Sequence, residues 1–192
     1  RLVRVEKERL DILVQRLTGV SRSKARGLIQ TGHVYDAEGR KLDKPGMRLE
    51  DGARLEIREE PRYVSRGGEK LEAAFEAFEF DVAGRVAIDV GASTGGFTDC
   101  LLQHGAAYVY AVDVGYGQLA WRLRQDPRVC VMERTNIRNL TVDALDRRPE
   151  VFTADCSFIS LRLVLPPLKE LLQAPAEGVV LVKPQFEAGK EL

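Results

Sequence analysis

The first run of apolar residues with helical spacing lies near the amino end of the chain. Its apolar positions recur three and four residues apart, at Leu10, Leu13, Val14 and Leu17, as on the buried side of an amphipathic helix. Gly19 follows, and glycine commonly ends a helix. We therefore expect a helix from about residue 10 that buries these four side chains.

A second helix and two short strands are expected next. Ser21 can cap the helix, whose apolar side would be Ala25, Leu28 and Ile29, and Gly32 suits the position just past its end. Residues 33–35 predict a strand that enters a turn at 36–39. Residues 54–57 alternate between polar and apolar, as a half-buried strand does. The first 58 residues therefore predict a small α+β domain.

Strand-like and helix-like segments alternate beyond the turn-forming residues at 59–61. The strand candidates are short and rich in β-branched residues: 86–90, 108–112, 129–132, 151–154 and 179–182. Helical stretches are expected at 97–104, 118–124 and 161–172, and a helix near residue 70 would bury Leu71, Ala74, Phe75 and Phe78. This alternation predicts an α/β fold with a doubly wound, mostly parallel sheet. We assign 1–58 to the small domain, 59–66 to a linker and 67–192 to the α/β domain.

Composition limits the class of protein. Hydrophobic residues make up 44% of the 192 residues, which suffices for a packed core, and Lys+Arg equal Asp+Glu at 29 each. Binding to nucleic acid would therefore need a local cluster of positive charge. No apolar run approaches the ~18 residues that cross a bilayer, so no membrane partner is expected. The chain begins at Arg1 rather than Met and stops just after a strand-like run, which indicates a fragment.

The cysteines favour no metal site and no disulfide framework. Cys100, Cys130 and Cys156 are odd in number and far apart, and no two have the spacing of metal ligands. We expect reduced thiols in a cytoplasmic protein, with no bound metal.

Basic residues gather on the two expected amino-terminal helices. They are the candidate RNA-binding residues Arg9, Arg16, Arg22, Lys24 and Arg26. Clusters of this kind bind phosphate backbones through counterion release, although a few arginines on a helix are also typical of a solvated face.

The order of short motifs favours the RNA-binding interpretation. Arg9-Leu10-Asp11 with Leu13, then Ser21-Arg22-Ser23-Lys24-Ala25, then Ile29-x-x-Gly32-x-Val34, and later Lys44-Pro45, occur in one series. The series resembles the S4 RNA-binding domain over most of residues 7–58. The resemblance implies binding to structured RNA.

A glycine-rich segment carries the strongest chemical signal. Residues 88–98, Ile-Asp-Val-Gly-Ala-Ser-Thr-Gly-Gly-Phe-Thr, follow the first strand of the α/β domain and open a helix. Glycines let the backbone turn sharply and approach a ligand, and Asp113, at the end of the next strand, could accept hydrogen bonds from an adenosine ribose. The candidate cofactor-binding residues are Asp89, Gly91, Ala92, Ser93, Gly95, Gly96, Phe97, Thr98, Asp113, Asn136 and Asp155.

Three kinds of ligand could bind such a segment. A P-loop is excluded because no Gly-Lys-Ser/Thr follows the glycines. NAD stays open, because Gly-x-x-x-Gly-Gly overlaps loosely with dinucleotide motifs, and a glycine-rich turn can also serve packing alone. The segment resembles motif I of Rossmann-like S-adenosylmethionine methyltransferases, nearest to the FtsJ-type ribose methyltransferases. That resemblance implies S-adenosylmethionine as cofactor.

Two lysines and an aspartate are the candidate catalytic residues. Lys183 follows the last strand, at the edge of the sheet where ligands bind in open α/β folds, and Lys70 enters a helix after residues 63–69. Each lysine alone is typical of a surface side chain. A lysine near Asp155 and another cation could, however, act as a base. The run at 154–161 lacks the Asn/Asp-Pro-Pro-Tyr pattern of amine methylation, and Cys156 lacks the Pro-Cys context of C5 chemistry.

The motifs together resemble the TlyA family, whose members are named both as hemolysins and as ribosomal RNA cytidine 2′-O-methyltransferases. The S4-like domain, Tyr-Val-Ser-Arg-Gly-Gly-x-Lys-Leu at 63–71, the glycine-rich segment, Asp-x-Ser-Phe-Ile-Ser-Leu at 155–161 and Val-Lys-Pro-Gln-Phe-Glu at 182–187 occur in one order. Arg66, in the second motif, joins the candidate RNA-binding residues.

The resemblance implies a Lys-Asp-Lys-Glu tetrad for 2′-O-methylation. Lys70, Asp155 and Lys183 match its first three positions. The glutamate is expected beyond Leu192, because Glu187 and Glu191 follow the second lysine too closely. We therefore expect truncation at the carboxyl end.

The sequence thus predicts a Rossmann-like methyltransferase preceded by an S4 domain, with ribosomal RNA or a ribosomal subunit as partner. A membrane-active hemolysin is the alternative from another class, and the sequence shows no long cationic amphipathic helix to support it. An RNA-binding or ribosome-assembly factor without turnover is a third interpretation.

Overall fold

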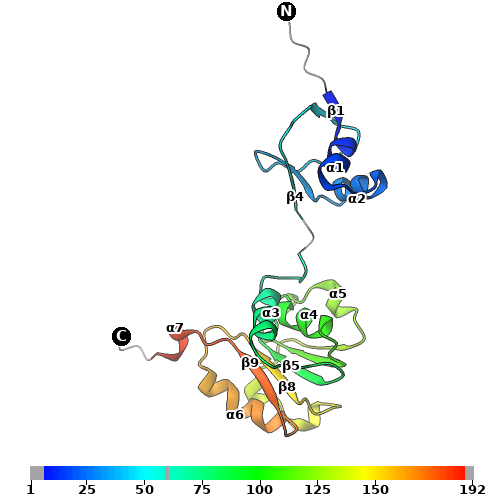
Figure 1. The fold of residues 1–192 in the computed structure, drawn as a ribbon. Coiled ribbons are helices and arrows are strands. Elements are labelled where there is room, and N and C mark those ends of the chain that lie inside the picture. The colour runs from blue at the N-terminus through cyan, green and yellow to red at the C-terminus, as the bar shows by residue number, and fades with distance from the viewer. Residues whose placement is uncertain (1–6, 59–60, 189–192) are drawn as a thin grey trace, which may run out of the picture. The chain divides into compact units, whose positions relative to one another are not determined.

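A computed structural model describes residues 7–58 and 61–188 of the chain. The chain divides into two compact units, Arg1–Glu60 and Pro61–Leu192. Figure 1 shows a small unit of two helices and short strands, and a larger unit built on a parallel sheet.

The small unit packs two helices against two antiparallel strand pairs. Helices α1 (Leu10–Thr18) and α2 (Arg22–Gln30) contact each other, β1 (Lys7–Arg9) pairs with β3 (Arg48–Glu50), and β2 (Val34–Asp36) pairs with β4 (Leu55–Ile57). Its core consists of apolar side chains from both helices, from β2 and from the connection after β2: Leu10, Val14, Ala25, Ile29, Val34 and Leu42.

The predicted helix boundaries in this unit are confirmed. The Ser21 side chain accepts a hydrogen bond from the backbone N–H of Lys24, and Gly32 has a φ of +85° just after α2, a conformation that glycine adopts without steric cost. Leu17 was expected in the core and is 58% exposed, because α1 is only partly covered at its last turn. The sequence pattern also did not predict strands β1 and β3, which are too short to show periodicity.

The larger unit contains five parallel strands in the order β7-β6-β5-β8-β9. These are β5 (Val86–Val90), β6 (Tyr108–Val112), β7 (Val129–Met132), β8 (Val151–Ala154) and β9 (Glu177–Val180). The helices are α3 (Gly67–Ala77), α4 (Gly96–Gln103), α5 (Trp121–Arg124), α6 (Leu161–Leu171) and α7 (Pro184–Glu187), with short 3₁₀ turns η1 (Ile137–Asn139) and η2 (Val142–Ala144). The predicted doubly wound sheet is confirmed, with strand order reversing between β5 and β8.

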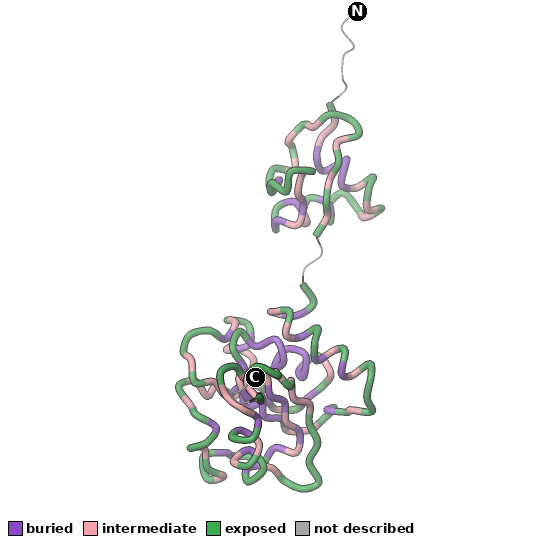
Figure 2. The backbone as a smooth tube through the Cα atoms, turned by 90° about the vertical axis from the view of Figure 1, so that its left-hand side faces the viewer, coloured by how far each residue is buried: buried purple, intermediate pink, exposed green. Residues whose placement is uncertain are grey.

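Alternate residues of each strand face the two helical layers. Ala87, Val109 and Val151 belong to the core that includes α3 and α4, whereas Ile88 and Tyr110 belong to the core that includes α6. Burial on both faces explains why these strands are continuous apolar runs rather than alternating ones. Figure 2 shows buried backbone concentrated inside this unit.

Three details differ from the sequence expectations. The last strand ends at Val180 rather than residue 182, and Phe78, expected in the core, is 68% exposed because α3 ends at Ala77. A linker was expected over 59–66, of which 59–60 lie outside the described residues. Tyr63 is buried in the core of the larger unit, because its ring packs beneath α3 next to Gly68.

Candidate active site

The glycine-rich turn between β5 and α4 is shaped by close backbone contacts. Gly91 has a φ of +81°, and a Cβ atom there would lie 2.7 Å from the carbonyl oxygen of Asp155. Gly95 has a φ of +100° and packs against Leu123, and a Cβ on Gly96 would meet the side chain of Ser65. The glycines therefore allow neighbouring segments of the chain to approach the turn.

Two cavities meet at this turn. The larger, about 490 Å³, extends from the turn past the end of β6 to the loop after β8, and the smaller, about 210 Å³, extends to α3. Both are lined by Gly91, Ser93, Asp155 and Ser157. The larger volume lies within the range of about 300–1,000 Å³ typical of small-molecule pockets.

The three candidate catalytic residues come together in the smaller cavity. The Lys183 ammonium lies 2.6 Å from Oδ1 of Asp155, and the Lys70 ammonium lies 3.7 Å from Oδ2 of the same carboxylate. Lys183 also donates a hydrogen bond of 3.0 Å to the hydroxyl of Ser157. One carboxylate thus balances two cations contributed by α3 and by the end of the sheet.

Asp113 stands at the carboxyl end of β6 and borders the larger cavity. Its Oδ2 accepts a hydrogen bond of 2.7 Å from the backbone N–H of Ser93, and its Oδ1 accepts one of 2.7 Å from that of Gly115. The carboxylate therefore joins the glycine-rich turn to the loop after β6. Each oxygen keeps a second lone pair for a ligand hydroxyl.

Comparisons with known proteins show the family of this chain. The model of the FtsJ-like methyltransferase family matches residues 63–192, and that of the S4 domain matches residues 8–55. The 16S/23S rRNA (cytidine-2′-O)-methyltransferase TlyA of Mycobacterium tuberculosis is 52% identical over 180 residues, which cover 93% of this chain and 67% of that protein. This chain belongs to the TlyA family of FtsJ-like methyltransferases.

Other relatives in the TlyA family carry a different name. Hemolysin A of Brachyspira hyodysenteriae is 44% identical over 88% of this chain and 70% of its own length. A solved structure of a hemolysin-named protein from Streptococcus thermophilus matches with a TM-score of 0.68 and 48% identity, over 97% of this chain and 70% of that one. None of the helices within the described residues is long and apolar enough to span a membrane.

The predicted cofactor residues fall into two groups in this TlyA-family chain. Most line one of the two cavities: Gly91, Ala92, Ser93, Gly96, Phe97, Asp113, Asn136 and Asp155. The Asn136 side chain also accepts a hydrogen bond from Arg138 N–H, as a turn-forming asparagine does. Gly95 lies behind the turn and packs against α5 instead.

Asp89 and Thr98 do not reach either cavity. Both are fully buried, and Asp89 accepts hydrogen bonds from Thr98 (2.7 Å) and Thr153 (3.0 Å). Burial raises the pKa of the Asp89 carboxyl to about 6. Neither side chain is placed to contact a cofactor in these cavities, contrary to the expectation from the sequence. Their hydrogen bonds instead join β5, α4 and β8 beneath the turn.

Two serines that line the cavities were not among the residues predicted from the sequence. Ser157 bonds to Lys183, and Ser65 lines the smaller cavity. Both stand inside the motifs that carry the TlyA resemblance, so the motif positions could have indicated them. Cys156 borders the larger cavity, and burial raises the pKa of its thiol to about 11, which disfavours a thiolate nucleophile at neutral pH.

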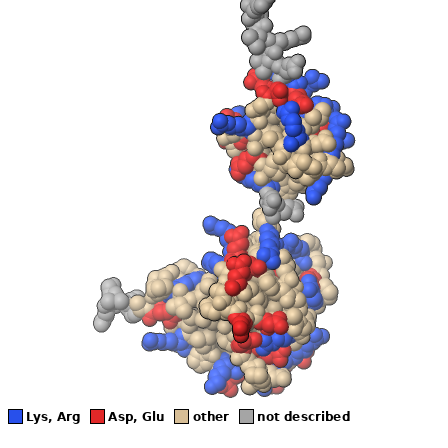
Figure 3. Space-filling view, in the orientation of Figure 1, with Lys and Arg blue, Asp and Glu red and all other residues tan. Residues whose placement is uncertain are grey.

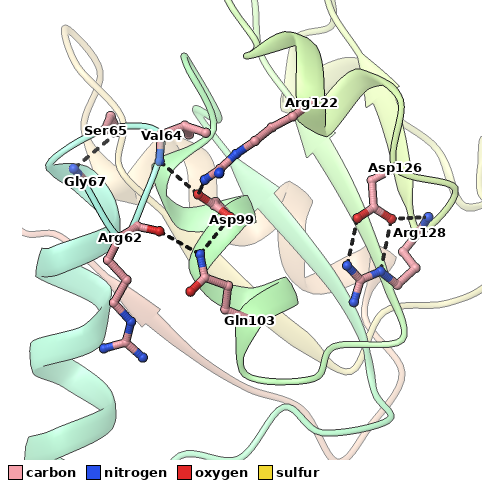
Figure 4. Close-up of polar contacts among 9 residues, drawn as sticks. All are labelled: Arg62, Val64, Ser65, Gly67, Asp99, Gln103, Arg122, Asp126 and Arg128. Carbon is pink, nitrogen blue, oxygen red and sulfur yellow. Dashed lines mark hydrogen bonds and ion pairs between the residues drawn. The ribbon is translucent and has the colours of Figure 1, made fainter. Parts of the chain in front are cut away.

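The segment before α3 is bound to α4 by polar contacts (Figure 4). The Val64 N–H donates to Oδ2 of Asp99 (2.8 Å), an oxygen that also pairs with Arg122, and Gln103 donates to the carbonyl of Arg62 (2.8 Å). Asp99 is nearly fully buried. These contacts hold the chain that leads to Lys70 against the helix that starts at the glycine-rich turn.

The candidate RNA-binding residues of the small unit are partly neutralised. Arg9 and Arg22 both pair with the fully buried carboxylate of Asp11, and Arg16 pairs with Asp51 (2.7 Å). Acidic and basic side chains are accordingly interspersed on the surface of this unit (Figure 3). Exposed Arg26 lines a surface hollow on α2 together with Arg22.

The remaining two RNA candidates are also exposed. Lys24 borders a second hollow, at the end of α1, and Arg66 lies immediately before α3.

Glu187 caps a helix rather than joining the lysines. Its carboxylate accepts hydrogen bonds from Leu161 N–H (2.8 Å) and the Ser160 hydroxyl (2.7 Å) at the start of α6, and these bonds lower its pKa. It is therefore not the fourth member of the expected tetrad. Glu191 lies outside the described residues.

One group of three side chains in the described ranges has the spacing of metal ligands: Glu72, Cys100 and His104. Glu72 accepts a hydrogen bond from Tyr63 and contacts the His104 ring at 2.7 Å and Arg62 at 2.9 Å. These contacts join α3 to the segment before it and to the end of α4.

Proposed function

We propose that this protein transfers a methyl group from S-adenosylmethionine to a ribose 2′-hydroxyl of ribosomal RNA, at cytidine. The observation that carries the proposal is the pairing of Lys70 and Lys183 with one carboxylate in a cavity that adjoins the glycine-rich turn. Family membership supports the reaction type, and the name of the M. tuberculosis relative supports the substrate.

The larger cavity fits the cofactor. Its size is suitable, Asp113 offers carboxylate lone pairs at the end of β6, and backbone of the turn forms the adjacent wall. When bound, S-adenosylmethionine supplies an electrophilic methyl group. Gly91, Ser93 and Asp155 line both cavities, so this boundary is where the methyl donor and the acceptor hydroxyl would meet.

Lys183 is the base in this proposal, and its charge environment permits the role. Two ammonium groups share the single negative charge of Asp155, so the cluster of three carries an excess positive charge when both lysines are protonated. With Lys183 as the neutral amine, the cluster would hold one ammonium and one carboxylate, whose charges balance. Lys183 then accepts the proton of the ribose hydroxyl, while the Lys70 ammonium stabilises negative charge that develops on the oxygen.

The two other groups near the amine position it. Asp155 fixes the ammonium through the ion pair, and the hydroxyl of Ser157 lies 3.0 Å from the same nitrogen. Holding the nucleophile beside the methyl donor contributes much of the rate in reactions of this kind. The S4 domain would bind structured ribosomal RNA, and the proposed reaction would take place in the cytoplasm, where ribosomal RNA is found.

Replacing the base tests the mechanism. Lys183→Ala in the full-length protein should lower the rate of tritiated methyl transfer to ribosomal RNA by ~10²–10⁴-fold, the usual scale of general acid–base catalysis. Calorimetric binding of S-adenosylmethionine should be retained. Lys169→Ala removes an exposed lysine on α6 and is the matched control, with activity equal to the parent.

The products decide between the candidate functions. Mass spectrometry should place the new methyl group on a ribose, and methyl transfer by Lys183→Ala within a few-fold of the parent would remove Lys183 from the mechanism. Leakage of liposomes at protein concentrations that give no methyl transfer would instead favour the hemolysin function named in some relatives.

A further inference from the structure

Three large apolar side chains are exposed on one segment of the larger unit, Val114–Trp121. Val114 is 71% exposed, Tyr116 67% and Trp121 73%. The segment directly follows Asp113, and its residues Val114, Gly115 and Gln118 line the larger cavity. We call residues 114–121 the aromatic loop.

Three backbone groups of the aromatic loop form hydrogen bonds to residues outside it: two to other backbone groups and one to a side chain. Gly115 accepts from Arg134 N–H (2.9 Å), the Gly117 N–H donates to Glu133 (3.0 Å), and the Ala120 N–H donates to the Thr94 carbonyl (3.0 Å). A loop fixed in this way loses little conformational entropy when it binds a partner, so its exposed rings form a preorganised surface.

The chain around the aromatic loop carries excess positive charge. Residues 114–138 contain five arginines but two acidic residues, Asp126 and Glu133. Both acids already have partners, because Asp126 pairs with Arg128 and Glu133 with Arg124. Two further arginines make no ion pair with any described residue: Arg134 and Arg138.

Arg134 is also placed against an aromatic ring. Its guanidinium lies 4.2 Å from the centre of the Tyr116 ring, and its φ of +50° is a conformation that residues other than glycine seldom adopt. The guanidinium lies over one face of the Tyr116 ring, so a nucleobase would stack on the opposite face of the ring or on the outer face of the guanidinium.

We propose that the aromatic loop is a second RNA-contact surface, on which Tyr116 and Trp121 stack unpaired bases of the substrate while the unpaired arginines bind its phosphates. The inference rests on the proposed function, and it adds a place where the methyltransferase unit itself binds the RNA. Surplus arginine beside exposed aromatic rings matches the chemistry of single-stranded nucleic acid, whose bases stack on rings and whose backbone is anionic. A protein partner would need an acidic surface to match the same arginines.

The chain contains its own reporter for this contact, because Trp121 is the only tryptophan. Titration of the protein with a single-stranded oligocytidine should quench the Trp121 fluorescence through stacking of bases. Polyphosphate of equal charge, which has no bases, should bind the arginines without comparable quenching. Equal quenching by both probes, or by neither, would overturn the proposal.

Variants then measure how much the rings contribute. Trp121→Ala should raise the Kd for fluorescently labelled oligocytidine, followed by anisotropy, roughly tenfold to hundredfold, as expected for loss of one base–aromatic stack. Trp121→Phe should restore most of the affinity. Phe78→Ala, which removes an equally exposed ring at the end of α3, is the matched control and should leave the Kd unchanged.

The outcomes separate this proposal from the proposed function. If the Trp121→Ala variant methylates ribosomal RNA normally and binds oligocytidine as the parent does, only the proposal for the aromatic loop is refuted. A parent that binds oligocytidine through Trp121 but transfers no methyl group would refute the proposed function alone. Dimerisation that Trp121→Ala abolishes, with RNA affinity unchanged, would show instead that the loop binds a second protein molecule.

Discussion

Gly91→Ala tests whether the glycine-rich turn positions Asp155, the carboxylate of the proposed catalytic cluster. Gly91 has a φ of +81°, and the new Cβ would lie 2.7 Å from the carbonyl oxygen of Asp155. That oxygen is backbone, so no side-chain rotation can relieve the contact. The loop after β8, which carries Asp155, must therefore move away from the turn.

Two effects lower the free energy of unfolding of Gly91→Ala. A left-handed conformation costs an alanine about 1–2 kcal/mol relative to glycine, and forcing an extra methyl group into a packed site costs typically about 1–3 kcal/mol more. We expect a loss of about 2–5 kcal/mol in the free energy of unfolding. Restoring ordinary contact requires a shift of roughly 0.7 Å at Asp155, and misplacement of about 1 Å can lower a rate by ~10²-fold.

A second glycine separates backbone strain from the clash. Gly84 has a φ of +72° and nothing within 4 Å of its would-be Cβ, so Gly84→Ala should cost only about 1–2 kcal/mol and leave methyl transfer unchanged. Urea unfolding followed by circular dichroism gives the free energies, and tritium transfer gives the rates. If the Gly91 and Gly84 variants lose equal stability and both retain full activity, the turn does not position Asp155.

Three further predictions concern electrostatics and capping. Hydrogen bonds from Arg9 hold the pKa of Asp11 at about 2, below its ordinary value of 3.8. This carboxylate therefore stabilises the fold above pH 4, and the stabilisation is lost as the pH falls toward 2. Asp11→Asn should remove this pH dependence from the free energy of unfolding measured between pH 2 and pH 4. Glu187→Ala removes one of two side chains that cap α6, the other being Ser160, and should cost about 0.5–2 kcal/mol in urea unfolding; an unchanged midpoint would contradict the capping role. Charge reversal of Arg26 should weaken RNA binding and flatten its salt dependence more than reversal of Arg22, which is already paired with Asp11; equal salt slopes for both variants would count against this ranking.

Much of the fold followed from local patterns in the sequence. The capped helix after Ser21, the glycine at position 32 and the alternation of buried strands with helices are properties of neighbouring residues, so spacing alone predicted them. Asp155 and Lys183 could be proposed for one site because both follow strands whose carboxyl ends share one edge of the sheet, whereas Lys70, on α3, was proposed through the motif resemblance.

Tertiary packing determines which side chains are buried at the ends of helices, and residue spacing in the sequence could not predict this. Whether Leu17 or Phe78 is buried depends on what covers the end of its helix, and the sequence pattern within the helix carries no information about that cover. The same holds for Asp89 and Asp113: both follow hydrophobic strand residues, yet Asp89 is closed in by Thr98 and Thr153 whereas Asp113 opens toward the larger cavity. Segments distant in the chain determine how exposed each carboxylate is and which groups it bonds to. Only the folded structure therefore distinguishes Asp89, which supports the turn, from Asp113, which can bind a ligand.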